Sequence, residues 1–217
     1  MGNVDVNIVS WNINGCGTPV KRKKVLSYLK SHNADIAYIQ ETHFANENEA
    51  LKLKRDWVGK VFHNSRSSKS RGVMVLINKR LNFVLLKESR DEDGRVLALQ
   101  ALINGVQVVL CNIYAPNRDE PNFMDEVNKM LGNMKGQILL GGDFNNVMDE
   151  YIDRSAINAT SSTRTGTAID ALKEDLSVVD IWRLVHPMER EYTFYSHSHK
   201  TYSQIDYFLI SKSCVNL

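Results

Sequence analysis

Short apolar runs alternate with polar stretches along this chain, and their periodicity predicts both strands and helices. Runs typical of buried strands occur at residues 6–13, 34–41, 72–79, 95–103, 106–116 and 137–147. Apolar positions at helical spacing predict helices at residues 21–33, 47–57, 120–131 and 168–176. Extended segments are predicted at 178–186, 192–196 and 203–211, and a polar loop at 155–167.

The order of these elements predicts the fold class. Asn104-Gly105 between two strands is a strong hairpin-turn signal, so we expect mixed rather than purely parallel sheets. Two packed mixed β-sheets flanked by helices account for the number of strands, which gives a four-layer α/β sandwich. The sequence shows no break in composition, no long linker and no repeat, so we expect one domain over residues 1–217.

Composition narrows the classes of protein to consider. The 217 residues are 43% hydrophobic with a net charge of +2, which allows a sizeable core but is too weakly basic to establish a nucleic-acid partner. The three cysteines lack metal-binding spacing, which predicts buried thiols in a reducing compartment. With no signal-peptide pattern and no apolar run of membrane-spanning length, we expect an intracellular protein that is neither secreted nor membrane-bound.

Polar residues recur at the ends of the apolar strands. They are Asn12, Glu41, Tyr114, Asn117, Asp143 and Asn145, and a further acid, Asp206, lies inside a late apolar run. Ligands of layered α/β folds commonly bind just beyond strand ends, so we expect these side chains to converge on one polar cleft. Taken singly, an Asp or Asn after a strand is more often a turn or helix-cap residue. Asp206 is harder to explain in that way, because burying an unpaired acid is costly.

The chemistry of these side chains favours one kind of metal. Hard oxygen donors dominate, with no accompanying His or Cys ligand set: Glu41, Asp143, Asp206, Asn12 and Asn145. Such donors favour Mg²⁺, for which Mn²⁺ can substitute, over Zn²⁺. A site of this type polarises a phosphodiester and stabilises the leaving oxygen. In this interpretation Asp143 orients or deprotonates the attacking water, and Asn145 helps to hold the water or the phosphate.

Two basic segments and a histidine pair have open interpretations. The loop at 63–72 either contacts DNA phosphates or is a solvated hairpin loop, with equal weight. The basic run at 21–24 is either a phosphate contact or, slightly favoured, a solubilising helix start. His197 and His199 together are only weak evidence for binding of a soft metal.

Five strings resemble the motifs of the exonuclease–endonuclease–phosphatase superfamily, in the family's order and across nearly the whole chain. They are WNING, IQETH, NIYAPN, GGDFNNV and SQIDYFLIS. The strings IQETHF, IDRS, DIWRLVHP, EYTFYS and KTYSQID further resemble the apurinic-like endonuclease domain of LINE-1-type non-LTR retrotransposons. The resemblance implies a Mg²⁺-dependent endonuclease that nicks duplex DNA and leaves a 3′-hydroxyl for target-primed reverse transcription.

The resemblance also implies roles for individual residues. Glu41 is expected to be the main Mg²⁺ ligand, with support from Asn12. Asp143 and Asn145 are expected to handle the nucleophilic water and the leaving group, while Tyr114 contacts the phosphate. The residues expected to contact DNA, several of them in a hairpin that enters the minor groove, are Asn117, Arg154, Thr193, His197, His199, Lys200, Thr201 and Ser203.

One departure from the family pattern affects the expected activity. The family's motifs end in a Ser-Asp-His segment, and Asp206 matches the carboxylate that orients its histidine. This segment would follow Leu217. We therefore expect a single domain that lacks the Ser-Asp-His segment and the last strand of one sheet. Its activity is expected to be weak or absent, because loss of such a group commonly lowers the rate about 10²–10⁴-fold.

Two alternative functions stay open. An abasic-site DNA repair endonuclease would use the same residues and prefer abasic DNA. A DNA-binding fragment without catalysis would bind duplex DNA in a salt-dependent way and leave it uncut. The retrotransposon interpretation implies a monomer that acts on double-stranded DNA, beside a reverse transcriptase domain and element RNA in a longer protein. Its expected location is the nucleus, after a cytoplasmic ribonucleoprotein stage.

Overall fold

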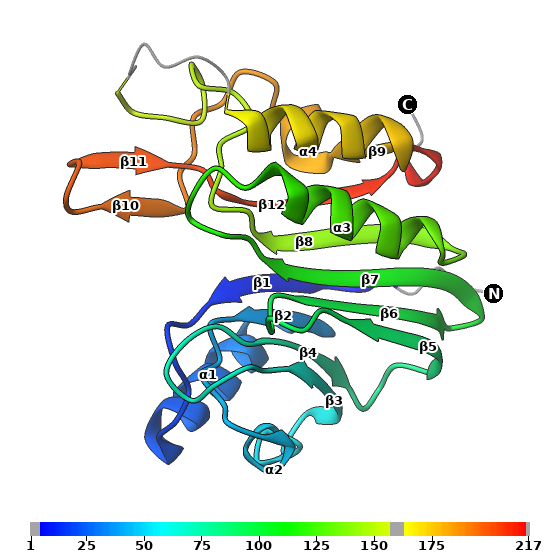
Figure 1. The fold of residues 1–217 in the computed structure, drawn as a ribbon. Helices are drawn as coiled ribbons and strands as arrows, with labels where there is room; N and C mark the ends of the chain where they lie inside the picture. Colours follow the sequence, from blue (N-terminus) through cyan, green and yellow to red (C-terminus); the bar gives the residue numbers. More distant parts are fainter. Residues whose placement is uncertain (1–4, 157–162, 216–217) are drawn as a thin grey trace.

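Two β-sheets lie face to face and helices cover their outer faces, so that the elements form four layers (Figure 1). The structure, a computed structural model, describes residues 5–156 and 163–215. Each sheet contains both parallel and antiparallel neighbours. The predicted four-layer α/β sandwich of two mixed sheets is confirmed.

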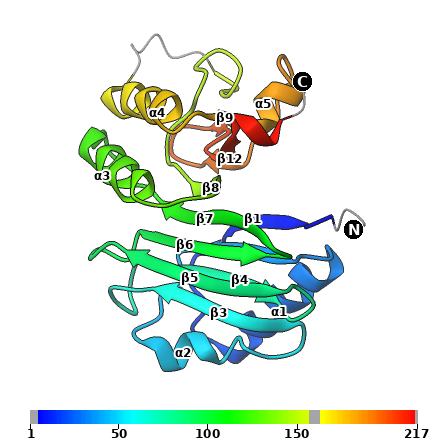
Figure 2. The same cartoon turned by 90° about the vertical axis from the view of Figure 1, so that its right-hand side faces the viewer.

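The first sheet has the strand order β1-β2-β4-β3. Its strands are β1 (Ile8–Asn12), β2 (Ile36–Gln40), β3 (Val58–Asn64) and β4 (Val73–Asn78). β1 and β2 are parallel, so the chain must cross over between them, and α1 (Pro19–Ser31) makes this connection. The short helix α2 (Glu47–Leu51) lies on the same outer side of the sheet as α1 (Figure 2).

The second sheet has the strand order β5-β6-β7-β8-β12-β9. Its strands are β5 (Phe83–Arg90), β6 (Val96–Ile103), β7 (Val106–Tyr114), β8 (Gln137–Asp143), β9 (Val178–Asp180) and β12 (Asp206–Ser211). α3 (Pro121–Gly132) connects the parallel strands β7 and β8, and α4 (Arg164–Asp175) packs beside it. The remaining elements are α5 (Ile181–Val185), β10 (Phe194–Ser196), β11 (Thr201–Ser203) and a 3₁₀ turn at Lys212–Cys214.

Apolar side chains fill the three spaces between the four layers. Val25 and Leu29 of α1 are buried against the outer face of the first sheet. Tyr38 and Leu99 lie between the two sheets, and Val127 of α3 is buried against the second sheet. Because both faces of each central strand are covered, these strands are almost continuously apolar, which explains why their sequences were easy to recognise.

The predicted turn at Asn104-Gly105 is confirmed. It joins the antiparallel strands β6 and β7, and its two residues have φ angles of +51° and +87°. Positive φ at both positions suits the twist of a two-residue hairpin, and Asn followed by Gly adopts it at low cost.

The prediction of an extended segment over 178–186 is wrong beyond Asp180. The Asp180 carboxylate accepts hydrogen bonds from the backbone N–H groups of Trp182 and Arg183, and this cap starts α5. The predicted polar loop at 155–167 also ends too late, because Thr163 caps α4, which begins at Arg164. Residues 157–162 of that predicted loop lie outside the described part of the chain.

Two strands, β3 and β5, have no counterpart among the predicted elements. β5 is an edge strand whose side chains Val84 and Leu86 are exposed, so its apolar residues do not follow the burial pattern expected of a strand. β3 extends to Asn64 and thus occupies the start of the predicted loop at 63–72. The helix predicted at 47–57 ends early, at Leu51.

The three cysteines are all free thiols. Cys16 and Cys111 are buried as predicted, but Cys214 is exposed, so the prediction of three buried thiols is wrong for that residue. Within residues 5–156 and 163–215, no helix combines the length and the apolar character needed to cross a membrane.

A buried polar network joins the two sheets behind the strand ends. The Asn112 side chain of β7 donates to the backbone carbonyls of Ile39 and Met74 at 3.0 and 2.8 Å. Its Oδ1 accepts from Gln40 Nε2 at 2.7 Å, and Gln40 Nε2 also donates to Ser10 Oγ at 3.0 Å. Two strands of the first sheet, β2 and β4, are therefore tied directly to the centre of the second sheet, and β1 is tied to it through Gln40.

We predict that Asn112→Ala lowers the free energy of unfolding by about 3 kcal/mol, because it leaves buried polar groups without partners and opens a cavity. Urea denaturation measures this change. Asn128→Ala is the matched control: Asn128 is half-buried on α3 and makes one hydrogen bond, to Asp175. Equal losses in the two variants would show that the network does not stabilise the sheet packing.

Candidate functional site

Three of the candidate residues form a row across the second sheet. Tyr114 ends β7 and is the register partner of Asp143, which ends the parallel strand β8. Asp206 begins the antiparallel strand β12 and is the register partner of Asp143 on the other side. The sheet therefore presents a phenol and two carboxylates on adjacent strands at one edge.

Two further candidates come from the first sheet. Asn12 ends β1, and Glu41 directly follows the parallel strand β2. Asn12 Nδ2 lies 3.0 Å from Glu41 Oε1 and 2.9 Å from Asp143 Oδ2, and it donates to both. The Asn12 amide thus bridges carboxylates of the two sheets. Asn12 Oδ1 accepts a hydrogen bond from the Asn14 backbone N–H, so the amide oxygen points toward the backbone of the following loop. A role for Asn12 as a metal ligand stays a prediction.

The two glycines before Asp143 are required by close packing around β8. A Cβ on Gly141 would collide with the Phe208 ring, and a Cβ on Gly142 would collide with the Ile113 backbone carbonyl. Gly142 also has a φ of +134°, which disfavours any other residue. The glycines let β7, β8 and β12 approach one another and so bring their terminal side chains together.

Three residues at the site have a left-handed backbone conformation. Glu41 and His43 have φ angles of +52° and +54°, and Asn145 has +50°. Non-glycine residues in this region are uncommon, and when they cluster they often mark a site whose geometry is imposed by its surroundings. Here the backbone N–H groups of Thr42 and His43 donate to the carbonyls of Gly72 and Arg71, which fixes the turn that presents Glu41.

Glu41 is held in its charged form. Partial burial raises the pKa of its carboxyl group, but hydrogen bonds from Asn12, Tyr114 and His43 outweigh this effect and lower the pKa overall. His43 Nε2 lies 3.1 Å from Glu41 Oε2. A charged, well-oriented carboxylate at the mouth of a cleft is suited to hold a cation.

The other two carboxylates have raised pKa values. Burial raises the pKa of Asp143, and the charge of Glu41 adds to the effect, against opposing hydrogen bonds from Asn12 and the Asn145 backbone. Burial, followed by the charge of Asp143, raises the pKa of Asp206 to about 7. The Thr193 hydroxyl group hydrogen-bonds to Asp206 and opposes this rise. The site therefore combines one carboxylate that stays charged, Glu41, with two carboxylates that take up protons more readily, Asp143 and Asp206.

Most of the strand-end candidates line a cleft of about 460 Å³, but Tyr114 is not among its lining residues. Its walls include Asn12, Glu41, Asp143, Asn145 and Asp206, together with Trp11 and Phe194. A neighbouring groove of about 390 Å³ shares the lining residues Asn145, Phe194 and Ile205 with it, so the cleft and the groove adjoin each other.

The residues predicted to contact DNA divide into three groups. The groove is lined by Asn117, Arg154, His199, Thr201 and Ser203. Thr193 instead lines the cleft, where its Oγ1 accepts from the backbone N–H groups of Ile205 and Asp206. His197 and Lys200 lie at the exposed turn of the β10–β11 hairpin, which projects from the sandwich (Figure 1). The structure places these residues on one side of the molecule, and contact with DNA stays a prediction.

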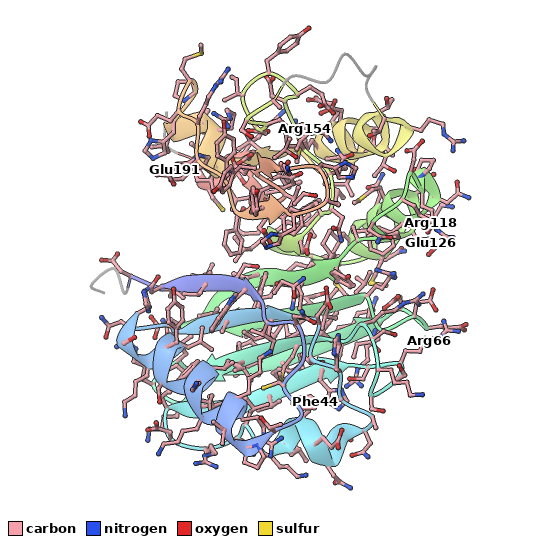
Figure 3. The ribbon with its side chains drawn as sticks, turned by 90° about the vertical axis from the view of Figure 1, so that its left-hand side faces the viewer. Phe44, Arg66, Arg118, Glu126, Arg154 and Glu191 are labelled. Carbon is pink, nitrogen blue, oxygen red and sulfur yellow. The ribbon has the colours of Figure 1, made fainter. Side chains whose placement is uncertain are left out.

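Several basic side chains surround this edge of the sandwich. Figure 3 faces the edge and labels Arg66, Arg118 and Arg154, which come from three separate loops. Each of them forms an ion pair, with Asp93, Glu120 and Glu150 respectively. In the basic run 21–24, Lys21 and Arg22 donate to backbone carbonyls of residues 14, 16 and 17, so these two side chains fasten the loop after β1.

Two residues in direct contact with the site are absent from the sequence-based predictions. His43 contacts Glu41, and its position two residues after Glu41 in the IQETH string is the signal that would have found it. Arg95 lies 5.0 Å from the centre of the Tyr114 ring. The contact between Arg95 and Tyr114 depends on the pairing of β6 with β7, so the sequence alone does not reveal it. In the sequence, Arg95 is marked only by its position at the start of an apolar strand.

The donor set fits a magnesium ion. Within residues 5–156 and 163–215, no three His, Cys, Asp or Glu side chains form a complete ligand cluster. Glu41 and Asp143 instead converge on Asn12 in an open cleft, and Mg²⁺ typically binds one or two carboxylates while keeping water ligands. The same set does not fit Zn²⁺, which takes nearly complete sets of His and Cys.

Fold and site together define a class of hydrolase that acts on phosphate esters, with carboxylates and amides gathered where two sheets meet. A family model described as the Endonuclease/Exonuclease/phosphatase family matches residues 9–216. The chain belongs to this family, whose members are nucleases and phosphoesterases that typically use a divalent metal.

Three known proteins show the range of the similarity. The chain is 29% identical over 212 residues to the Transposon TX1 uncharacterized 149 kDa protein of Xenopus laevis, covering 95% of this chain and 16% of that protein. It is 26% identical over 235 residues to an exodeoxyribonuclease of Bacillus subtilis, and the match covers 96% of this chain and 89% of that protein. The crystal structure of the AP endonuclease LMAP from Leishmania major has the same fold, with a TM-score of 0.76 and 19% sequence identity. The match covers 95% of this chain and 79% of that chain.

We predict that Asp206 makes the stability of the protein decrease with rising pH. The pKa of Asp206 is about 7 in the folded chain against an ordinary value of 3.8. Between these values the folded protein holds a proton that the unfolded chain has released, so the free energy of unfolding falls as the pH rises. Asp206→Asn should remove a decrease on the order of 3 kcal/mol between pH 4 and pH 8.

Urea denaturation at a series of pH values checks this prediction. Asp170→Asn, on the exposed face of α4, is the control and should follow the wild-type curve. Parallel curves for wild type and Asp206→Asn would contradict the raised pKa.

Proposed function

We propose that the chain is a Mg²⁺-dependent endonuclease that nicks duplex DNA at a phosphodiester. The observation that carries this proposal is the Asn12 amide, which bridges Glu41 and Asp143 in a cleft that adjoins the hairpin groove. A cation site alone would suit many enzymes. A cation site that adjoins a groove beside a projecting hairpin suits a polymeric phosphodiester substrate.

Each side chain has a role that its surroundings support. Asp143 has a raised pKa and is the group best suited to orient a water molecule and take its proton. The Asn145 side-chain nitrogen donates to the Ala115 carbonyl at 2.8 Å. The amide oxygen of Asn145 is then left to hold the same water. Burial and then the hydrogen bond to Glu41 raise the pKa of Tyr114, so its hydroxyl stays protonated and donates to the Glu41 carboxylate. A donation to a phosphate oxygen would require the hydroxyl to leave Glu41.

Glu41, in its charged form, is the residue that would hold Mg²⁺, with Mn²⁺ as a substitute. When bound, the ion polarises the scissile phosphate and stabilises charge on the leaving oxygen. Asn12 keeps the Glu41 and Asp143 carboxylates at a fixed separation by donating to both. Asp206 hydrogen-bonds to Thr193 and contributes a second proton-accepting group at the far side of Asp143.

The groove would bind the DNA strand on one side of the cut. Asn117, Arg154, His199, Thr201 and Ser203 line it, and they can donate hydrogen bonds to phosphate and sugar oxygens. Phe194 is exposed at 47% and lines both the cleft and the groove. The projecting turn with His197 and Lys200 would reach along the duplex and influence the choice of target.

We further propose that the nick serves retrotransposition. The support is the similarity to the TX1 transposon protein, of which the chain spans 16% of the length. In such a protein the released 3′-hydroxyl would prime reverse transcription of element RNA by a reverse transcriptase domain. This role would place the protein in the nucleus, after assembly with RNA in the cytoplasm.

We predict that the chain converts supercoiled plasmid to the nicked form at a low rate with Mg²⁺ or Mn²⁺, and not with excess EDTA. Glu41→Ala and Asp143→Ala should each lower the nicking rate by at least about 100-fold, because they remove the cation-binding and water-orienting carboxylates. Agarose electrophoresis of the plasmid forms measures this rate. Asp170→Ala, an exposed acid on α4, should nick at the wild-type rate.

The same assay with an abasic and an intact duplex separates the alternatives. Comparable cutting of both substrates, with a ligatable 3′-hydroxyl, supports the retrotransposon role. A strong preference for the abasic duplex would favour a repair endonuclease. Salt-dependent binding of DNA by folded protein without any cut would contradict the proposal and leave a DNA-binding module.

A further inference from the structure

Arg95 makes three contacts with Tyr114. The Tyr114 backbone N–H donates to the Arg95 carbonyl at 2.8 Å, and Arg95 NH1 donates to the Tyr114 carbonyl at 2.9 Å. The guanidinium group lies 5.0 Å from the centre of the Tyr114 ring, within the range of a cation–π interaction. One arginine side chain therefore holds both the backbone end of β7 and the ring of its last residue.

The far end of the Tyr114 ring reaches the first sheet. Its hydroxyl group hydrogen-bonds to Glu41, the candidate cation ligand. The ring thus spans the distance from Arg95 on one sheet to Glu41 on the other. Any freedom of the ring would loosen this hydrogen bond, so the contacts on the Arg95 side determine how well Glu41 is oriented.

Arg95 differs from the arginines around it. Arg66, Arg71, Arg118 and Arg164 each form an ion pair with a carboxylate. Among the residues that the structure describes, Arg95 forms none. It is half-buried, and burial followed by the nearby charge of Arg71 lowers its pKa. The charges of Asp91 and Glu120 partly offset the cost of keeping a cation there, and the direct contacts of the guanidinium group are with the Tyr114 carbonyl and ring.

We infer that Arg95 is a positioning residue that locks the Tyr114 ring, and through it the Glu41 carboxylate, in the geometry that binds the cation. The inference rests on the proposed function for its catalytic consequence. Its structural content, the dependence of Glu41 on Arg95 through Tyr114, is separate and can be measured without DNA. Arg95 itself touches neither the cation nor the scissile phosphate in this account.

The test is a double-mutant cycle in Mg²⁺ affinity, measured by isothermal titration calorimetry on the intact chain. The variants are Arg95→Ala, Tyr114→Phe and the double variant, since Tyr114→Phe keeps the ring and removes only the hydroxyl group. We expect each single variant to bind Mg²⁺ about three- to tenfold more weakly. The double variant should bind no more weakly than Tyr114→Phe, because Arg95 acts through the hydroxyl group.

Three further variants separate positioning from general damage. Arg95→Lys keeps a cation near the ring and should recover part of the affinity. If Arg95→Ala does not fold, as judged by circular dichroism, Arg95→Gln replaces it, because glutamine changes the side-chain volume less than alanine does. Arg90→Ala, an exposed arginine of β5 paired with Glu88, is the control and should bind Mg²⁺ like the wild type.

The inference would be overturned by unchanged Mg²⁺ affinity in Arg95→Ala, or by losses that multiply in the double variant. A purely salt-dependent loss of DNA affinity would instead make Arg95 a direct phosphate contact, which also overturns it. If the wild type binds no Mg²⁺, the proposed function fails. The inference is then decided by NMR of ¹³C-labelled tyrosine, in which the Tyr114 ring signals must move and broaden in Arg95→Ala and not in Arg90→Ala.

Discussion

The candidate site depends on one amide group that connects two sheets. Asn12 Nδ2 donates at 3.0 Å to Glu41 and at 2.9 Å to Asp143, which belong to the first and second sheet respectively. Two carboxylates this close repel each other, and a shared donor between them offsets the repulsion. The relative position of the sheets therefore sets the separation of the groups that would act on a phosphodiester.

The rest of the fold serves to keep that relative position fixed. The buried network of Asn112 and Gln40 ties the sheets together directly behind the strand ends. Gly141 and Gly142 let three strands approach closely, and Arg95 fixes the ring of Tyr114. The positive φ of Glu41 is tolerated because neighbouring backbone hydrogen bonds determine the turn around it.

Sequence patterns predicted most of this fold because both faces of its central strands are covered, which makes those strands recognisable as apolar runs. They failed where tertiary context decides: β5 is an edge strand with exposed apolar residues, and α5 begins at the cap made by Asp180. Glu41 and Asp143 were predicted as site residues because each ends an apolar run. The bridge through Asn12 and the contact of Arg95 with Tyr114 were not predicted, because they depend on how strands distant in sequence pair and stack.

The most direct test of this account is anomalous X-ray diffraction from crystals of the chain soaked in Mn²⁺, which substitutes for Mg²⁺ and scatters anomalously. The account predicts a principal Mn²⁺ peak within coordination distance of the Glu41 carboxylate, beside Asn12 and Asp143. A principal peak elsewhere, such as at His197 and His199, or no peak at Glu41 in crystals with an open cleft, would contradict it.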